Sequence, residues 1–554
     1  MKNKKQKQGN PPGSFFGNTR LQAVVLGLLV FILYSRTVSF EYIGFDDTTM
    51  IVDNYRFIRN FENIPRAFTE HVFYFENNID KDKEYYRPMM TLSFMLDAHI
   101  AGSYMPRWYH FANVVYHFAA CLLLLFFLRK IKAGHAAAFV LTLIFAVHPV
   151  VTQAVAWIPG RNDMLLAIFM FSSFIFFMEY LETKRRRPLM LHLIFFAFAL
   201  FSKENGVMFP VLCFFYMQFI HREKLLSRSG MLLSAGYILF IVPWIFLRQH
   251  ALEGSSVENS FHSAIANIIK NAPFLLQYVG KAVLPFNLSV MFTIEDANYI
   301  FPLLALGLII LGIVLSAAKR WSYMIFGLSW FLLFLVPSFS ARLVEGLEHR
   351  LYVPVAGFFI LASETDWMKA LSSAKAKLFT VPVLTFAVFL FITGSRIDIF
   401  RNRFSFYLSA IETSEHAIVP CINLAADYEQ IGKPEKAMEM YRIALGRDST
   451  YRMLRNNIGG MYLHRQMFRE AEHEFLAELR HHPENVYANY NLGLVYLNTG
   501  RVDEAAVMWK KVLALQSDFV NAYQRLMQYY QGRGDTISYN HYAEAYRRFA
   551  KSSQ

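Results

Sequence analysis

Long apolar runs separated by short polar segments dominate the first two thirds of the chain. A run of about 20 apolar residues is long enough to cross the hydrocarbon core of a membrane as a helix. The pattern therefore predicts an all-α, polytopic transmembrane domain with about 11 spans over residues 21–399. The candidate runs are 21–40, 108–128, 136–151, 163–181, 189–202, 206–220, 231–248, 301–318, 321–338, 350–363 and 378–396. Several runs are short, so neighbours such as 189–202 and 206–220 could form one broken element.

Basic residues gather at the ends of alternate runs and indicate an orientation. They occupy the N-terminal segment 1–20 and then follow every second run, at 129–132, 184–187, 222–228, 319–320 and 369–377. Short loops rich in Lys and Arg stay in the cytoplasm. We therefore expect a cytoplasmic N-terminus and a C-terminal region on the opposite side of the membrane.

The same orientation gives two large non-cytoplasmic loops, at 41–107 and 249–300. The second loop contains an amphipathic stretch, 261–269. Such a stretch could lie along the membrane interface or pack against the protein's own outer face.

Composition supports a membrane protein and argues against two other classes. The chain is 55% hydrophobic and 18% charged, whereas soluble domains have about 25% charged residues. The net charge of +13 arises mainly from clusters that flank apolar runs, so we expect no nucleic-acid partner. The three cysteines (Cys121, Cys213 and Cys421) are too far apart for a metal-binding motif.

Beyond residue 415 the sequence repeats every 34 residues. Large apolar residues, tyrosines, alanines and aromatics recur in register, as in Leu424, Ile458, Leu492 and Leu526, and in Tyr428, Tyr462, Tyr496 and Tyr530. This pattern resembles the tetratricopeptide repeat, in which stacked helix pairs form a superhelix. We expect this domain over 400–554, with repeats near 418–451, 452–485 and 486–519 and a degenerate one at 520–550. Its groove would bind a polypeptide acceptor or partner; the alternative is a purely structural cap.

Ionisable residues recur at the run ends that this topology places on the non-cytoplasmic side. Charges at such positions are costly and are usually functional or paired. Interface anchors would be Lys and Arg alone, whereas acids and histidines accompany them here. We therefore expect one shared site, formed from Asp46, Asp47, Arg87, His148, Arg161, Asp163, Lys203, Glu204, Glu348, His349 and Arg350.

These residue types favour group transfer from a lipid phosphate. The adjacent carboxylates of Asp46 and Asp47 can supply a general base or ligands for a metal ion. Arginine and lysine side chains can hold a phosphate, and at a bilayer surface that phosphate belongs to a lipid carrier. The pattern predicts transfer from a polyprenyl-phosphate carrier to an acceptor hydroxyl, without naming the sugar.

Five segments resemble the transmembrane and tetratricopeptide repeat O-mannosyltransferases, a GT-C fold family related to the protein O-mannosyltransferases. The segments are 45–51, 86–91, 148–163, 202–206 and 348–354. The resemblance covers about 40–365 and extends to the repeats, which follow in the same order. The chain departs from the family in its few repeats and in the presence of His349 and Val353 within the last motif. Its short basic N-terminus and short repeat array resemble a bacterial member, which implies a location in the inner membrane with the repeats in the periplasm.

The resemblance implies inverting transfer of a sugar, mannose, from a polyprenyl- or dolichyl-phosphate donor to Ser or Thr of a protein. It assigns the catalytic carboxylate to Asp46 or Asp47, and of the two we expect Asp47 to be more sensitive to substitution. The remaining substrate-binding residues divide into a lipid-phosphate group, Arg161, Lys203 and Arg350, and a group that lines the pocket, Arg87, His148, Asp163, Glu204 and His349. The chemistry requires no cofactor, although the two aspartates could hold Mg²⁺ or Mn²⁺.

Two alternatives remain open. The same chemistry could act on a polysaccharide or lipid acceptor, against which the repeats weigh because such grooves mostly bind polypeptide. The chain could also be a non-catalytic membrane scaffold that presents its repeats. A scaffold has no need of the carboxylates and cations gathered on one face.

Overall fold

A computed structural model describes residues 15–73, 85–253, 261–317, 320–341, 345–371 and 379–551. These residues are largely helical, and the isolated β-bridge within them joins Phe292 to Gly346. The all-α class predicted from the sequence is therefore confirmed for the described residues. The chain divides into two compact units, Met1–Ser409 and Ala410–Gln554, which we call the transmembrane unit and the repeat unit.

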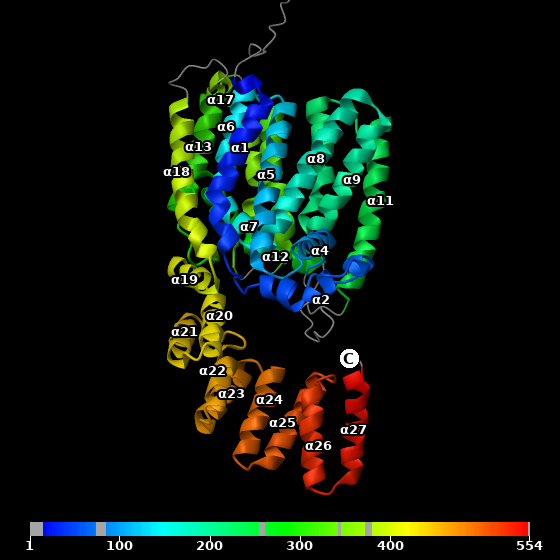
Figure 1. Ribbon diagram of the computed structural model, residues 1–554, viewed down its shortest axis with the longest axis vertical. Helices are drawn as coiled ribbons and strands as arrows, with labels where there is room; N and C mark the ends of the chain where they lie inside the picture. The colour runs from blue at the N-terminus through cyan, green and yellow to red at the C-terminus, as the bar shows by residue number, and fades with distance from the viewer. Residues whose placement is uncertain are drawn as a thin grey trace, which may run out of the picture. The chain divides into compact units, whose positions relative to one another are not determined.

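The transmembrane unit combines long helices with short helical turns (Figure 1). The first half contains η1 (Phe15–Gly17), α1 (Thr19–Tyr34), η2 (Ser35–Ser39), η3 (Thr48–Asp53), α2 (Tyr55–Ile58), η4 (Phe61–Asn63), α3 (Ile64–Ala67), α4 (Pro88–Ala101), α5 (Pro106–Lys130), α6 (His135–Ala146), η5 (Pro149–Val151), α7 (Thr152–Ala156), η6 (Ile158–Gly160), α8 (Arg161–Thr183) and α9 (Arg186–Ser202). The second half contains η7 (Glu204–Met208), α10 (Phe209–Phe215), η8 (Tyr216–His221), α11 (Arg228–Ala251), α12 (Phe261–Val283), α13 (Ile300–Leu315), α14 (Trp321–Leu333), α15 (Val336–Ser340), η9 (Glu348–Leu351), α16 (Val355–Ser363), α17 (Asp366–Ala370), α18 (Thr380–Arg396), η12 (Ile397–Phe400) and the start of α19 (Arg403–Thr413).

Among the described residues, six helical segments are long and apolar enough to cross a membrane. They are Thr19–Ser39, Pro106–Lys130, Ile158–Thr183, Arg228–Ala251, Trp321–Ser340 and Thr380–Phe400. The bent pair His135–Ala146 and Pro149–Ala156 would make a seventh. These apolar helices support the predicted class of multi-pass membrane protein.

The predicted count of about 11 spans is not confirmed. Three of the predicted runs form shorter helices: α9 has 17 residues, α13 has 16 and α16 has nine. At 1.5 Å per residue, nine residues cover only about 14 Å of a hydrocarbon core about 30 Å thick. The run 206–220 is divided between η7, α10 and the π-helix η8. Apolar composition alone therefore does not make each of these segments a separate span.

The predicted first outer loop is a folded cap. The helices α2 and α4 lie across one end of the bundle (Figure 1). They enclose a core in which Met50, Ile51, Phe57 and Phe94 pack together with Tyr109 at the start of α5. Residues 74–84 of the predicted loop lie outside the described residues. This cap holds the chain around Asp46 and Asp47 against the ends of the long helices.

In the second predicted outer loop, the described stretch 261–283 forms the helix α12, which packs against α13 and α15. Its amide side chains face the protein, because Asn267 donates to the carbonyl of Ser340 and Asn271 donates to that of Phe339. These contacts show that one face of α12 packs against the protein. Ile265 and Ile269 of the same stretch are exposed, so both alternatives stay open.

The repeat unit consists of antiparallel helix pairs. Its helices are α20 (Val419–Gln430), α21 (Pro434–Arg447), α22 (Leu454–His464), α23 (Phe468–His481), α24 (Val486–Asn498), α25 (Val502–Leu515), α26 (Val520–Gly532) and α27 (Thr536–Lys551). The residues that repeat every 34 positions form the core, in which Leu492, Tyr496 and Leu526 are buried around Trp509. The unit thus has the helix pairs that the repeat pattern predicts.

Candidate functional site

Asp47 closes the turn that follows the first span. Its side chain is fully buried, and its carboxylate accepts hydrogen bonds from the backbone N–H groups of Ile43 at 2.8 Å, Gly44 at 2.8 Å and Thr48 at 3.0 Å. Gly44 has a φ of +77°, a conformation that a residue with a side chain rarely adopts. Burial raises the pKa of Asp47 to about 6, although the three N–H donors oppose that rise. Asp47 therefore acts as the local cap that shapes this turn.

Asp46 is the more accessible of the two carboxylates. It is half-buried, and its backbone carbonyl accepts from the N–H of Met50 at 2.9 Å, which places it at the start of η3. The oxygens of Asp47 are already engaged by backbone donors, whereas part of the Asp46 residue faces solvent. This geometry does not favour the sequence-based preference for Asp47 as the more sensitive catalytic residue.

The turn is held from behind by the segment that follows α18. The N–H of Glu41 donates to the carbonyl of Arg401 at 2.9 Å, and Arg36 forms an ion pair with Asp398 at 2.9 Å. The guanidinium of Arg403 lies against Gly44, where an added Cβ would come within 3.2 Å of it. The φ of Gly44 therefore favours glycine at this position, and an added Cβ would also make the Arg403 guanidinium shift slightly.

Five of the predicted site residues form one ionic cluster, in which all but the partly exposed Glu204 are buried. The ammonium of Lys203 pairs with Asp163 at 2.7 Å, and the other oxygen of Asp163 accepts from Nδ1 of His349 at 2.8 Å. The guanidinium of Arg87 contacts both oxygens of Glu204, at 2.9 and 3.3 Å. Because Lys203 and Glu204 are adjacent in the chain, the two pairs join the ends of α4, α8, α9 and η9.

The cluster is electrically balanced. Burial alone would raise the pKa of Glu204, but the charges of Arg87 and Lys203 lower it to about 2. Burial lowers the pKa of Lys203, and it lowers the pKa of His349 to about 4, so that imidazole is neutral at pH 7. Two cations thus face two carboxylates. A bound phosphate needs positive charge beyond these pairs.

Two buried polar atoms beside the cluster have no hydrogen-bond partner among the residues that the structure describes: Nε2 of His349 and Nε1 of Trp157. The two rings lie 5.3 Å apart, and the ring of Phe45, next to Asp46, lies 5.8 Å from Trp157. Since Nδ1 of His349 donates to Asp163, Nε2 of the neutral ring is an acceptor. Unpaired buried polar groups are costly, so this donor and acceptor mark a place where a ligand group fits.

Arg161 is saturated by contacts within the protein. It is fully buried, and it donates to Asp97 at 2.5 Å, to the side chain of Asn113 at 3.0 Å and to the carbonyl of Tyr109 at 3.0 Å. Its predicted contact with a lipid phosphate stays a prediction, and this geometry favours a structural role instead. Sequence reasoning missed Asp97, although a single carboxylate within the apolar stretch 88–101 was a usable signal.

Among the described residues, His148 and Arg350 form hydrogen bonds with residues outside the ionic cluster. Nε2 of His148 donates to the carbonyl of Ala282 at 3.0 Å, and Nδ1 accepts from the N–H of Val150 at 3.3 Å, so this ring joins η5 to the end of α12. Arg350 is half-buried and donates to the carbonyl of Glu345 at 3.4 Å. Its immediate neighbour in the chain is His349, which places a cation next to the cluster.

Glu348 anchors η9, the short helix that also carries His349 and Arg350. It is fully buried, accepts from the N–H of Ser289 at 2.7 Å, and pairs with Lys281 at 3.3 Å and Arg396 at 2.6 Å. These two cations were also missed from the sequence. Their contacts fix η9 against α12 and α18, and so fix the position of His349.

The two aspartates do not make a convincing metal site. Both oxygens of Asp47 accept backbone N–H bonds, which leaves little capacity for a cation between Asp46 and Asp47. No group of three or more His, Cys, Asp or Glu side chains arranged to hold a metal ion occurs among the described residues. We therefore derive no step through Mg²⁺ or Mn²⁺.

Comparison with known proteins adds an independent line of evidence. Residues 89–246 match the family described as dolichyl-phosphate-mannose-protein mannosyltransferase, and residues 462–509 match the tetratricopeptide repeat. Human protein O-mannosyl-transferase TMTC4 is 23% identical over 252 residues, which cover 39% of this chain and 33% of the relative. Mouse TMTC1 is 32% identical over 158 residues, which cover 26% of this chain and 17% of the relative. The chain thus spans about a third of the length of TMTC4.

Mouse protein O-mannosyl-transferase TMTC3 matches over a much longer stretch, with 21% identity over 555 aligned positions that cover 86% of this chain and 58% of the relative. The matched regions include the segments that carry Arg161, Asp163 and Lys203 as well as the repeats. The predicted resemblance is therefore confirmed, and the chain is a relative of the transmembrane and tetratricopeptide repeat protein O-mannosyl-transferases.

Proposed function

We propose that this chain is a membrane glycosyltransferase that moves mannose from a polyprenyl- or dolichyl-phosphate carrier to a Ser or Thr hydroxyl of a protein. The observation that carries the proposal is the buried cluster of Lys203, Asp163 and His349 next to the turn with Asp46 and Asp47. Buried ionisable groups with perturbed pKa values are concentrated at functional sites. The mannosyltransferase description of the family matched at 89–246 supports the choice of sugar and carrier.

Asp46 is the general base in this proposal. A Ser or Thr hydroxyl is a poor nucleophile at neutral pH and needs a base within hydrogen-bond reach. The acceptor oxygen attacks the anomeric carbon while its proton passes to the carboxylate of Asp46. The bond between that carbon and the phosphate oxygen breaks, and the lipid phosphate leaves with the electron pair. Asp47 keeps the turn in shape through its three backbone hydrogen bonds.

Lys203 and Arg350 stabilise the charge on the departing phosphate. Lys203 is fixed by Asp163, and Arg350 supplies positive charge beyond the balanced pairs of the cluster. Donors fixed in advance at a site from which water is excluded stabilise developing charge more strongly than water does. Arg87 serves the same site through Glu204, which it holds next to Lys203.

The unpaired atoms of Trp157 and His349 give the sugar a place. A sugar hydroxyl both donates and accepts, so one hydroxyl can accept from Nε1 of Trp157 and donate to Nε2 of His349. The aromatic rings of Phe45 and Trp157 offer an apolar surface beside the same atoms. Their position between Asp46 and the ionic cluster suits the sugar, which must lie between base and phosphate.

The orientation of the chain follows its basic clusters. The segments at 129–132 and 184–187 lie at the ends of α5 and α8 opposite to Asn113 and Asp163. With these segments in the cytoplasm, transfer takes place on the non-cytoplasmic face. We infer that the repeat unit lies on that face too and that its groove binds the polypeptide acceptor or a protein partner.

A transfer assay with the purified full chain in liposomes tests the proposal. The donor is polyprenyl-phosphate mannose, and the acceptors are a Ser/Thr peptide, its alanine counterpart, and a glycolipid. We expect mannose on the Ser/Thr peptide only. Transfer to the glycolipid alone, or transfer from nucleotide-linked mannose without the lipid donor, would overturn the assignment.

A further inference from the structure

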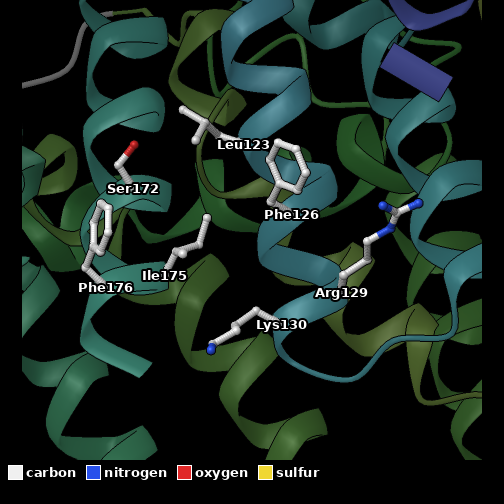
Figure 2. A pocket seen from close by; sticks show the side chains of 7 residues that line it. All are labelled: Leu123, Phe126, Arg129, Lys130, Ser172, Ile175 and Phe176. Atoms are coloured by element: carbon white, nitrogen blue, oxygen red, sulfur yellow. The ribbon is translucent and has the colours of Figure 1, made fainter. Parts of the chain in front are cut away.

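A surface groove of about 500 Å³ lies between α5 and α8, far from the candidate active site (Figure 2). Its volume falls within the range of small-ligand sites, about 300–1,000 Å³. The lining residues are Leu123, Phe126, Arg129 and Lys130 of α5, and Ser172, Ile175 and Phe176 of α8. Asn113, which binds Arg161, precedes Arg129 by 16 positions in α5. At 1.5 Å per residue this separation is about 24 Å.

The walls of the groove are apolar and firmly supported. Leu123 and Phe126 are three positions apart on α5, and Ile175 and Phe176 lie one turn beyond Ser172 on α8, so each helix presents one face to the groove (Figure 2). The ring of Phe176 stacks on Phe195 of α9 at 5.7 Å, which holds it in place. Both helices are long and apolar enough to cross a membrane, so a bilayer around them would bring its hydrocarbon to this groove.

The end of the groove is strongly basic. The segments 129–132 and 184–187, which end α5 and join α8 to α9, contain seven Lys or Arg residues and no acid. Lys130 pairs with Glu182 at 2.9 Å, where both side chains are substantially exposed, so this pair is weak and can exchange for another anion. Arg129 turns toward α1 and donates to Thr19 at 2.8 Å, with no carboxylate partner among the described residues.

We propose that this groove holds one anionic phospholipid, with an acyl chain along Phe126 and Ile175 and its phosphate at Lys130. Basic pockets between transmembrane helices on the cytoplasmic side favour anionic headgroups. The surplus of positive charge at this end attracts a lipid with net negative charge more strongly than a zwitterionic lipid. The site goes beyond mannose transfer, since it binds a structural lipid of the cytoplasmic leaflet and takes no part in the reaction.

Native mass spectrometry of the purified full chain, titrated with phosphatidylglycerol or phosphatidylcholine, tests this site. We expect one phosphatidylglycerol to be retained with about a tenfold preference over phosphatidylcholine. Lys130→Gln should weaken retention of phosphatidylglycerol about fivefold, the effect of one basic residue near a headgroup. Ile175→Trp fills the groove and should abolish retention of both lipids.

Two matched variants control for general effects. Lys224→Gln removes an exposed cation elsewhere on the same predicted side, and Leu239→Trp enlarges an exposed apolar residue of α11 outside the groove. Both should bind like the wild type. Equal retention of the two lipids, or wild-type retention by Ile175→Trp, would overturn the proposal, as would equal losses in Lys130→Gln and Lys224→Gln. Thermal melting of each variant confirms that the protein is folded.

Discussion

Opposite ends of α8 carry charge in two different settings. At its start, Asp163 pairs with Lys203, and each side chain is only 3% exposed. At its end, Glu182 pairs with Lys130, and the two side chains are 53% and 30% exposed. The same kinds of residue therefore form the buried cluster of the candidate active site at one end and the basic surface beside the groove between α5 and α8 at the other.

The difference in burial between the two pairs indicates which charged residues need a functional explanation. Burying an ion pair costs several kcal/mol per ion in lost hydration. An exposed pair avoids that cost and contributes about 0–1 kcal/mol to stability. The exposed basic residues suffice to orient the chain in the membrane. The buried pair of Asp163 and Lys203 needs another reason to exist, and the proposed departure of a charged lipid phosphate beside it would supply one.

Removal of one partner from the buried pair of Arg161 and Asp97 should have the largest effect on stability. Arg161→Met leaves the carboxylate of Asp97 buried without its cation, at a cost of about 3–5 kcal/mol. The double variant Arg161→Met with Asp97→Leu should regain most of this loss. Thermal and denaturant unfolding in detergent measure both. If Arg161→Met lowers the free energy of unfolding by less than about 1 kcal/mol, buried and exposed pairs at the two ends of α8 would not differ in their effect on stability.

Lys203→Met should lower mannose transfer about 100-fold, which corresponds to about 2.7 kcal/mol of transition-state stabilisation. Lys184→Met changes the same residue type at the basic end and should leave the rate unchanged. Initial rates with saturating acceptor peptide measure this. Similar rates for the two variants would reduce Lys203 to a structural residue.

The pH dependence of stability should separate two buried groups. The pKa of His349 is lowered to about 4, so its neutral form favours folding and stability increases as the pH rises from about 4 to 6.5. The pKa of Asp47 is raised to about 6, so folding favours its protonated form and stability decreases between about 4 and 6. Melting temperatures from pH 4 to 6.5 should therefore rise less in His349→Gln than in wild type, and rise more in Asp47→Asn. Identical profiles for all three proteins would show that neither group is perturbed.

The smallest effect is expected at the basic end. Lys184 pairs with Glu223 at the surface, and Lys184→Gln should change the free energy of unfolding by less than about 1 kcal/mol. Raising the salt concentration should weaken the wild-type pair to the same extent, since exposed charges are screened. A larger loss in the unfolding experiment would mean that this end, too, depends on its ion pairs.

Much of the candidate site could be predicted from the sequence, because its residues lie at the ends of the long apolar helices. Asp163 begins one long helix, Lys203 ends the next and His349 follows a third, so a consistent topology places all three at one face. The core positions of the repeat unit, occupied by tyrosines and leucines, could be predicted equally well, because each helix pair repeats after 34 residues.

The features that sequence reasoning missed depend on long-range packing. The partner of Arg161 is Asp97, 64 positions away in a stretch read as a loop, and no periodicity links the two. Short buried helices such as α16 have the same apolar composition as membrane spans, so composition alone does not separate the two. The different settings of Asp46 and Asp47 arise from the fold of their turn, which adjacent identical residues cannot reveal.

The most direct test of the account compares mannose transfer by Asp46→Asn and Asp47→Asn in purified, reconstituted protein. Asn keeps the shape of Asp but cannot take a proton at neutral pH, so loss of the base should slow transfer about 10²–10⁴-fold. We predict this loss for Asp46→Asn with binding of polyprenyl-phosphate mannose retained, and a milder loss with a lower melting temperature for Asp47→Asn. Wild-type transfer rates in Asp46→Asn would contradict the central claim and move the base elsewhere.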